Sequence, residues 1–344
     1  MKKAMLSIIS LIMFVVLAGC SSSAGSKEKD TLTIAWLPNE SGADLGETRE
    51  AISEVLEKAT GKKIEHKTTT DYLVAIEAIA NGNADLAFLG AQGYIEANNK
   101  NKKVQPLVVP SGESGTLDDA VYYSWLAVLK DNADSYKDGG SFSIDKIAGQ
   151  KFSFVSNSST SGFKVPSTGI VDYFSKKDEF KDLTAEDLLE GGKDKFFSEV
   201  LYGGSHQGSA VNLLTGKADV AAFCDTCVNN YVELADGEEN RPGAIYKVRA
   251  DAAEPFNTVT GKEFTLISVA PVLNSPFVVN TETVSEDIQK KLLETLTSDE
   301  VAKNEKIFVP EDSEVKGLFK RKSGNERLVQ AEDDWFNPIR ELSK

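Results

Sequence analysis

Histidine, cysteine and basic side chains are in short supply in this sequence of 344 residues. Its 38 lysines and arginines face 53 aspartates and glutamates, so the formal charge at pH 7 is −15. An acidic chain without a basic stripe is a poor candidate for nucleic-acid binding, because that binding depends on cationic contacts to phosphates. A zinc site at the pair Cys224 and Cys227 would need two further ligands, and the only histidines in the sequence are His66 and His206. We therefore expect no nucleic-acid partner, no metal and no cofactor.

The sequence also lacks an apolar run long enough to cross a membrane. About 20 apolar residues are needed, and the run Ala4–Ala18 is shorter. It follows a short cationic start and ends in Leu-Ala-Gly-Cys, a pattern typical of a secretory signal. This ending resembles a bacterial lipobox, in which Cys20 is lipidated and begins the mature chain. We expect a signal peptide at 1–19, a flexible tether at 20–30, and an extracytoplasmic protein anchored to the cell membrane by a lipid on Cys20.

Cys224 and Cys227 then lie in an oxidising compartment with the spacing Cys-x-x-Cys. Exported cysteines tend to pair, which favours a local disulfide. Half of a metal site and a redox motif at the start of a helix remain alternatives. The sequence leaves the redox state of the pair open.

Short apolar strands alternate with amphipathic helices along the rest of the chain. This alternation predicts an α/β fold with mostly parallel sheets. The strands are expected at Leu32–Leu37, Lys62–Thr70, Ala84–Leu89, Phe152–Val155 and Val220–Phe223, and the helices at Glu47–Ala59, Tyr72–Ala80, Ala210–Leu214 and Glu286–Leu296.

Two segments, Ile79–Gly90 and Leu213–Asp225, share one pattern. In each, a helix ends at a glycine, and an Ala-Asp pair containing Asp85 or Asp219 leads into a buried strand. Two similar α/β lobes would produce this repetition, although helix–Gly–Asp–strand connections are common and chance is an alternative. The chain length also favours two lobes.

A longer series of motifs extends from about Thr31 to about Pro276. It resembles, in the same order, the phosphonate/phosphite-binding lipoproteins of ABC importers. The matching motifs are Thr31–Pro38, Thr70-Asp71-Tyr72, Gly82–Gly90 followed by Tyr94, Tyr122-Tyr123-Ser124, Ser159-Thr160-Ser161-Gly162 ahead of Pro166-Ser167, Gly204-Ser205-His206, and Gly216–Ala222 with Asp225.

The resemblance implies a two-lobed periplasmic-binding-protein fold of type II, with a hinge of two crossover segments. We expect the first lobe at 31–120 plus 254–344 and the second at 122–250. Such a protein is a monomer that closes on a small anionic phosphorus ligand and delivers it to a membrane permease, without catalysis. The cysteine pair departs from the family's pattern, which leaves the identity of the ligand open.

The run Ser159, Thr160, Ser161 and Gly162 follows a predicted strand and opens a predicted helix. A helix start presents unpaired N–H groups and a partial positive charge, so it favours an anion. Three hydroxyls add neutral donors, and the glycine permits a close approach of the backbone. We predict that this run binds the anion. The alternative is ordinary helix capping, which one of these residues is expected to provide.

His206 and Asp225 are also predicted to contact the ligand. Asp225 follows the strand Val220–Phe223 at its carboxyl end, where open α/β sheets bind ligands. A carboxylate beside an anion suits a ligand that is protonated on oxygen or carries an amine, and His206 can donate to an oxygen. Within the family, this His and Asp combination is typical of phosphite-like or methylphosphonate-like ligands. On the structural alternative, His206 caps the following helix and Asp225 binds a backbone amide.

Four tyrosines complete the predicted site. Tyr72 and Tyr123 match the family's two aromatic ligand contacts, with Tyr122 as an alternative to Tyr123, and Tyr94 is expected to line the same site. A phenol offers a donor and a flat wall to a short alkyl group. The alternative for each of these tyrosines is a structural role at the edge of a hydrophobic core.

Two other functions stay open. On one alternative, the same fold binds another oxyanion, a sulfonate or a vitamin-like molecule, because a fold does not define its ligand. A secreted hydrolase would use Ser161, His206 and Asp225 as a triad, although the strand–turn–helix elbow Gly-x-Ser-x-Gly is missing from this sequence. We favour a binding protein over an enzyme.

Overall fold

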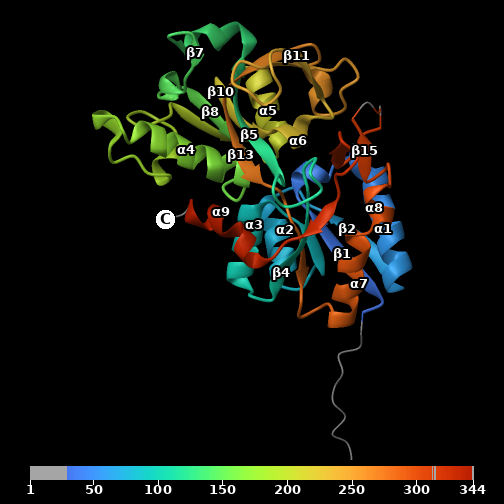
Figure 1. Cartoon of the computed structure of the whole chain (residues 1–344). Helices are drawn as coiled ribbons and strands as arrows, with labels where there is room; N and C mark the ends of the chain where they lie inside the picture. Colours follow the sequence, from blue (N-terminus) through green and yellow to red (C-terminus); the bar gives the residue numbers. More distant parts are fainter. Residues whose placement is uncertain (1–28, 312, 314, 343–344) are drawn as a thin grey trace, which may run out of the picture. The chain divides into compact units, whose positions relative to one another are not determined.

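The computed structural model of the protein describes residues 29–311, 313 and 315–342 (Figure 1). The predicted signal peptide, Cys20 and most of the predicted tether lie outside these residues. Within them, no helix combines the length and the apolar character that a membrane span requires. The chain from Thr31 onward forms one compact unit that contains two large sheets.

The first sheet has six strands in the order β17-β4-β14-β3-β1-β2. Helices α1 and α7 contribute to a hydrophobic cluster on one side of this sheet, and α2 and α3 to a second cluster on the other. Its strands are β1 (Thr31–Trp36), β2 (Lys63–Thr68), β3 (Leu86–Phe88), β4 (Val104–Pro110), β14 (Phe277–Asn280) and β17 (Leu328–Gln330), and its helices are α1 (Gly46–Thr60), α2 (Tyr72–Ala80), α3 (Ala91–Lys100) and α7 (Glu286–Leu296).

The second sheet has seven strands in the order β11-β12-β13-β5-β10-β8-β9. Helices α5 and α6 share one hydrophobic cluster with it, and α4 lies in the cluster on the opposite face. Its strands are β5 (Val121–Leu129), β8 (Lys151–Phe154), β9 (Glu199–Tyr202), β10 (Val220–Cys224), β11 (Val232–Asp236), β12 (Ile245–Val248) and β13 (Glu263–Leu273), and its helices are α4 (Val165–Phe174), α5 (His206–Leu214) and α6 (Asp225–Val228).

Smaller elements complete the fold. The short pairs β6–β7 and β15–β16 form two further sheets. These elements are β6 (Lys137–Asp138), β7 (Ser141–Phe142), α8 (Asp299–Ala302), β15 (Phe308–Pro310), β16 (Phe319–Arg321) and α9 (Asn337–Glu341).

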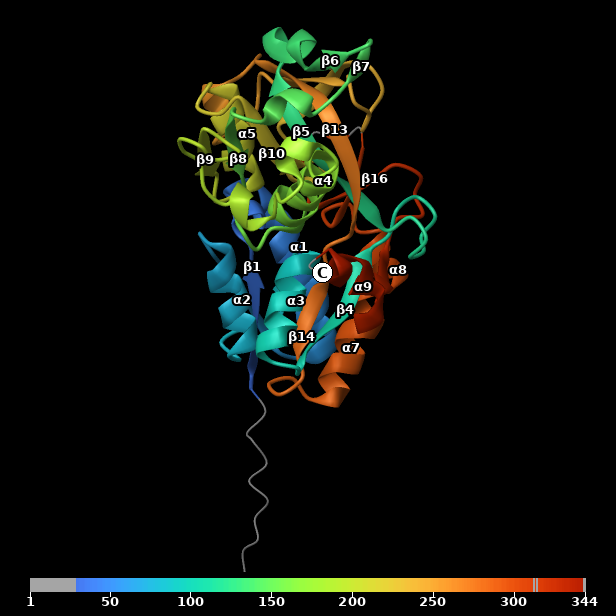
Figure 2. The same cartoon turned by 90° about the vertical axis from the view of Figure 1, so that its left-hand side faces the viewer.

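Two connections join the large sheets, and both can be followed in Figure 2. The chain leaves the first sheet between β4 and β5 and returns to it between β13 and β14. The connections are bound to each other: the backbone N–H of Asn274 donates to the Ala120 carbonyl at 3.0 Å, and its side-chain amide donates to the Pro110 carbonyl at 2.8 Å. This arrangement matches the expected pair of crossover segments.

The two helix-flanked sheets confirm the predicted α/β class, with a correction to the strand directions. Parallel pairing joins β1 to β2 and β3, and β8 to β9 and β10, whereas β5, β13 and β14 pair antiparallel with their neighbours. Parallel neighbours need a crossover such as a helix. Strands β5, β13 and β14 lie where the chain passes from one sheet to the other, and no such crossover connects them to a neighbour in the same sheet. They pair antiparallel, so both sheets are mixed rather than mostly parallel.

The second sheet also extends past the predicted lobe boundary at 250. Strand β13, at Glu263–Leu273, pairs with β5 from Phe264 opposite Leu129 to Leu273 opposite Val121. The sequence assigned 254–344 to the first lobe, but the residues of β13 belong to the seven-stranded sheet. The pattern of this strand gave no sign of which sheet it joins.

The repeated segments fold alike in the two sheets. In the first, the Asp85 carboxylate accepts the Thr33 N–H at 2.9 Å, and the Asp85 N–H donates to the Thr33 carbonyl at 2.8 Å. In the second, Asp219 makes the same two contacts with Lys151, at 3.0 and 2.9 Å. Each aspartate therefore fixes the start of a strand against its neighbour. Asp85 is fully buried, whereas Asp219 is partly exposed.

We expect this difference in burial to appear in stability. Asp85→Ala leaves the Thr33 N–H unsatisfied in the core, which should lower the free energy of unfolding by about 1–3 kcal/mol. Asp219→Ala, the matched control, should cost less because water can reach the Lys151 N–H. Denaturant unfolding followed by circular dichroism measures both, and equal losses would contradict the expectation.

Candidate functional site

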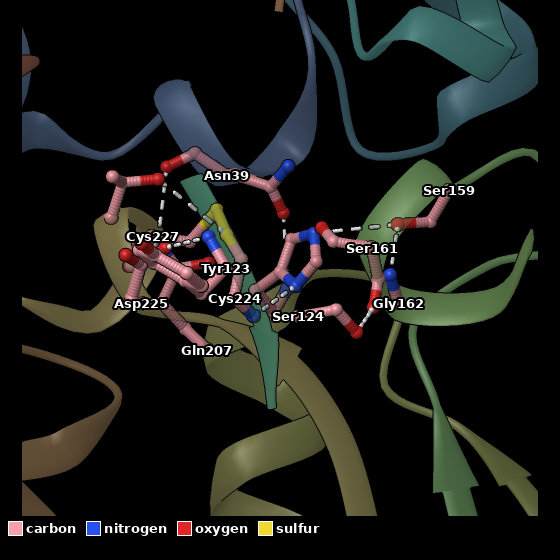
Figure 3. Close-up of a disulfide and its surroundings, with 12 residues drawn as sticks. Asn39, Tyr123, Ser124, Ser159, Ser161, Gly162, Gln207, Cys224, Asp225 and Cys227 are labelled. Carbon is pink, nitrogen blue, oxygen red and sulfur yellow. Dashed lines mark hydrogen bonds between the residues drawn. A yellow bond between two sulfur atoms is a disulfide. The ribbon is translucent and has the colours of Figure 1, made fainter. Parts of the chain in front are cut away.

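The hydroxyl run lies in a widened helical turn that leads into α4 (Figure 3). The Ser159 carbonyl accepts the Lys164 N–H at 2.9 Å, one residue further along than in an α-helix, and the Ser159 hydroxyl accepts the Gly162 N–H at 3.1 Å. A Cβ atom on Gly162 would lie 2.3 Å from a methyl group of Val155. Glycine is therefore required for the turn to pack against strand β8 and the residues that follow it.

The three hydroxyls have different roles. Ser159 is the helix cap that the sequence led us to expect. The Thr160 hydroxyl accepts the Gln92 N–H at 2.9 Å and so contacts the first turn of α3, beside the other sheet. The Ser161 hydroxyl is buried, and no group among the described residues forms a hydrogen bond with it. Capping thus explains one member of the run and leaves Ser161 with an unused donor.

His206 is the first residue of α5 and is fixed on three sides. Its backbone N–H donates to the Asn39 side chain at 3.0 Å, and the ring atom Nδ1 accepts the backbone N–H of Cys224 at 3.0 Å. Burial lowers the pKa of His206 to about 3, so the ring is neutral and its proton lies on Nε2. Nε2 lies 3.3 Å from the Ser159 hydroxyl. The ring therefore presents a neutral N–H to the hydroxyl run.

Asp225 follows strand β10 and begins α6, between two cysteines that are joined in a disulfide. Its Oδ1 accepts the Tyr123 N–H at 2.9 Å. Burial raises the pKa of Asp225 to about 7, although its contacts with backbone N–H groups act in the opposite direction. Near neutral pH this carboxyl is therefore divided between its protonated and charged forms.

Tyr72 is brought to the hydroxyl run by Asn39. The Asn39 amide donates to the Tyr72 hydroxyl at 2.6 Å, and its oxygen accepts the His206 N–H. Burial raises the pKa of Tyr72 well above its usual value, while the neighbouring Ser159 hydroxyl opposes that rise. Tyr72 is therefore a neutral phenol beside Ser159, and Asn39 links it to the backbone of His206.

The other three tyrosines lie in different places. Tyr122 is buried near Ser161, outside hydrogen-bond geometry, and burial raises the pKa of its phenol. Tyr123 contacts Asp225 through its backbone, and its side chain is partly exposed. Tyr94 is fully buried and donates to the Asp333 carboxylate. The structure therefore brings Tyr122 close to the run and does not bring Tyr94 to it.

A cavity of about 1220 Å³ adjoins His206. Both sheets contribute to its walls, through Asn39 and Glu40 after β1 and through Gln207 and Asp225 near α5 and α6. Tyr122 and Tyr123 also line this cavity, whereas the hydroxyl run and Tyr72 lie outside its walls. His206 thus stands between the buried hydroxyl run and the cavity.

Three polar residues of this region were not predicted from the sequence. Asn39 binds both Tyr72 and His206, and the Gln207 amide donates to the carbonyls of Asn39 and Cys227, each at 3.1 Å. Burial raises the pKa of Glu40 to about 8. The position of Asn39 and Glu40 just after the first strand was the available signal, because ligands bind at the carboxyl ends of such strands.

The geometry does not form the hydrolase triad. Nδ1 of His206 accepts a backbone N–H from Cys224, so it cannot donate to Asp225 as a triad histidine would. The ligating atoms of His206, Cys224 and Cys227 lie within 4.8 Å of one another, but the two sulfurs are bonded to each other. Neither sulfur is then available as a thiolate ligand.

Two helix-flanked sheets, two crossover connections and polar residues of both sheets beside one cavity define a two-lobed solute-binding protein. The sequence model for the family "ABC transporter, phosphonate, periplasmic substrate-binding protein" matches residues 34–336. The chain therefore belongs to that family, and the predicted family is confirmed.

Individual relatives agree with this assignment. The phosphate-import protein PhnD of Mycolicibacterium smegmatis is 28% identical over 222 residues, which cover 64% of this chain and 62% of that protein. A binding protein component of an ABC phosphonate transporter from Pseudomonas aeruginosa has a similar structure, with a TM-score of 0.63, 19% identity and coverage of 92% of this chain and 86% of its own. PhnD1 from Prochlorococcus marinus, solved in complex with methylphosphonate, has a TM-score of 0.60, 17% identity and coverage of 91% and 97%. These structures confirm the predicted type II fold.

Proposed function

We propose that this protein captures a phosphonate, phosphite or phosphate-like anion outside the cytoplasm and delivers it to an ABC permease. The observation that carries the proposal is the buried Ser161 hydroxyl, which has no partner among the described residues. It belongs to a run whose neighbours are the neutral N–H of His206 and the phenols of Tyr72 and Tyr122. The phosphate and methylphosphonate named for two relatives support the same ligand class.

These donors suit an anion that must be released again. Ser161, His206 and the two phenols are neutral groups that can each donate to a phosphorus oxygen. Hydrogen bonds to a charged acceptor are stronger than those between neutral groups, and burial strengthens them further. In a chain with a formal charge of −15, binding then depends on local donors rather than on long-range attraction.

We further propose that the ligand is enclosed by closure of the two lobes of a monomer. Contacts between the lobes meet at the site: Asn39 with His206, Asn39 with Gln207, and Gln92 with Thr160. Opening the cleft would break these hydrogen bonds, and a ligand held by both lobes would favour the closed form.

The lipid on Cys20 is proposed to hold this binding unit at the membrane surface. Cys20→Ala removes the acceptor of the lipid, so the protein should move from the membrane fraction to the soluble fraction. Fractionation followed by immunoblotting measures this change. An unchanged distribution would contradict the anchor and leave the binding proposal untouched.

The proposed anion contact is tested at Ser161. Ser161→Ala should weaken binding of methylphosphonate, phosphite or phosphate by about 1–3 kcal/mol, the cost of one hydrogen bond to a charged group. Thr168→Ala is the matched control, because its hydroxyl lies on α4, the helix that follows the run, and donates to the Lys164 carbonyl at 2.9 Å. Isothermal titration calorimetry measures all three proteins.

Two results would contradict that expectation in different ways. Equal affinities of the Ser161→Ala variant and the wild type would remove Ser161 from the site. Failure of the wild type to bind any phosphorus anion, together with binding of sulfate, a sulfonate or a vitamin-like molecule, would replace the ligand class.

Asp225 should make binding depend on pH. Its protonated carboxyl can donate to the anion, whereas the carboxylate repels it, so affinity should fall as pH rises from about 6 to about 8 through the raised pKa. Asp225→Asn has an amide donor at every pH and should flatten this decline. The ratio of the two affinities at each pH cancels the ligand's own ionisation.

The same titration with 2-aminoethylphosphonate distinguishes a second role. If Asp225 holds an amine, the wild type should prefer this ligand over methylphosphonate, and the variant should lose the preference. Identical pH profiles and identical ligand rankings in the two proteins would mean that Asp225 has only its structural contact with Tyr123.

A further inference from the structure

We infer that the disulfide between Cys224 and Cys227 positions the ligand-binding residues, and that its reduction weakens ligand binding while the fold persists. The inference rests on the proposed function for the identity of the ligand. Its structural part concerns His206, Asp225 and Gln207, which all contact or belong to the turn that the disulfide closes (Figure 3).

The disulfide constrains one turn rather than distant parts of the fold. Its cysteines are three positions apart, with their Cα atoms 5.4 Å from each other, at the junction of β10 and α6. A disulfide that closes so short a loop removes less entropy from the unfolded chain than one that closes a long loop. Its main effect is therefore on the geometry of residues 224–227.

The first end of this turn orients His206. The Cys224 N–H donates to Nδ1 of the ring, which places the proton on Nε2. Nε2 is the atom that faces the Ser159 hydroxyl. If the turn relaxes, Nδ1 loses its fixed donor, and the other tautomer and other ring orientations become accessible.

The middle and the far end of the turn, at Asp225 and Cys227, contact residues that line the cleft between the lobes. Asp225 lies between the cysteines, and its carboxylate is held by the Tyr123 N–H. The Cys227 carbonyl accepts the Gln207 amide, which also donates to the Asn39 carbonyl of the other lobe. One disulfide thus supports a proposed donor, a proposed pH-sensitive carboxyl and a bridge between the lobes.

The disulfide can be reached from the cavity beside His206. Cys227 is partly exposed and lines the cavity, whereas Cys224 is fully buried. With dithiothreitol as reductant, a thiolate attacks the Cys227 sulfur and Cys224 leaves as a thiolate, which takes up a proton. The second thiol of the reagent then displaces Cys227. Two electrons and two protons pass to the cysteines, and the reagent becomes a cyclic disulfide.

The first experiment compares affinities for methylphosphonate by calorimetry. Reduction should weaken binding by the wild type about tenfold. The variant Cys224→Ser/Cys227→Ser should bind about as weakly as the reduced wild type and should not respond to dithiothreitol. A chelator is present throughout, because the freed thiols and His206 would lie close enough to ligate a metal. Circular dichroism checks that each protein stays folded.

The second experiment measures the effect of the bound ligand on the reduction of the disulfide. If reduction weakens binding tenfold, saturating methylphosphonate must make the disulfide harder to reduce by the same factor. A tenfold change corresponds to about 30 mV for two electrons, so the reduction potential should fall by about 30 mV. A salt that does not bind, at equal ionic strength, provides the control.

The third experiment needs no ligand. Nitrogen-15 resonances distinguish the two tautomers of a histidine, and the chain has only two histidines. Reduction should shift the His206 resonances towards a mixture of tautomers. His66 is the internal control, because its Nδ1 accepts the Trp36 side-chain N–H at 2.9 Å, in the other sheet.

The outcomes separate this inference from the proposed function. Equal affinities of the oxidised and reduced protein, with unchanged His206 resonances, would overturn the inference and keep the function. Loss of the folded circular dichroism signal on reduction would also overturn it. If no phosphorus anion binds in either state but the His206 resonances still shift, the proposed ligand is wrong and the positioning role of the disulfide stands.

Discussion

The hydrogen bond from the Cys224 backbone to Nδ1 of His206 is the contact on which the arrangement of the site depends. It joins the end of an interior strand to the first residue of a helix and satisfies an N–H that would otherwise be buried without a partner. Because it determines the tautomer, it also determines the direction of the remaining ring proton. The ring that is fixed in this way faces the Ser159 hydroxyl, while Asn39 accepts the backbone N–H of His206 and donates to the Tyr72 hydroxyl.

Burial favours the uncharged forms of both the basic and the acidic side chains in this region. It lowers the pKa of His206 to about 3 and raises those of Asp225 and Glu40 to about 7 and about 8. Near neutral pH the ring is uncharged and the carboxyls are largely or partly protonated. An acidic protein can therefore present a site whose own side chains repel an anion only weakly. The same protonation makes the carboxyls possible donors.

Much of the fold could be predicted because local patterns determine it. Helices α2 and α7 begin and end at the predicted residues, and the Asp85 and Asp219 repeat reflects real hydrogen bonds in both sheets. The strand directions were harder, because they depend on how the chain passes between sheets. Nothing local in the residues of β13 indicates which sheet that strand joins.

The residues missing from the prediction act across the cleft. Asn39 and His206 are 167 positions apart, and no periodicity links them. The choice between Tyr122 and Tyr123 depends on the face of β5 that each occupies, which is set by the pairing of Ser124 with Cys224. Tyr94 lies in α3, but its hydroxyl contacts Asp333, 239 positions away. Local signals identify candidate residues, and tertiary contacts decide which of them meet.

Asn274 joins the two crossover connections to each other by hydrogen bonds. Through its backbone and its side chain it bonds to residues at both ends of the outgoing connection, Pro110 and Ala120, while it belongs to the returning one. Neither connection can bend freely without straining the other. In the proposed closure, a rotation of one sheet against the other would therefore be confined to a common axis through both connections, so that the two connections would act as a single hinge.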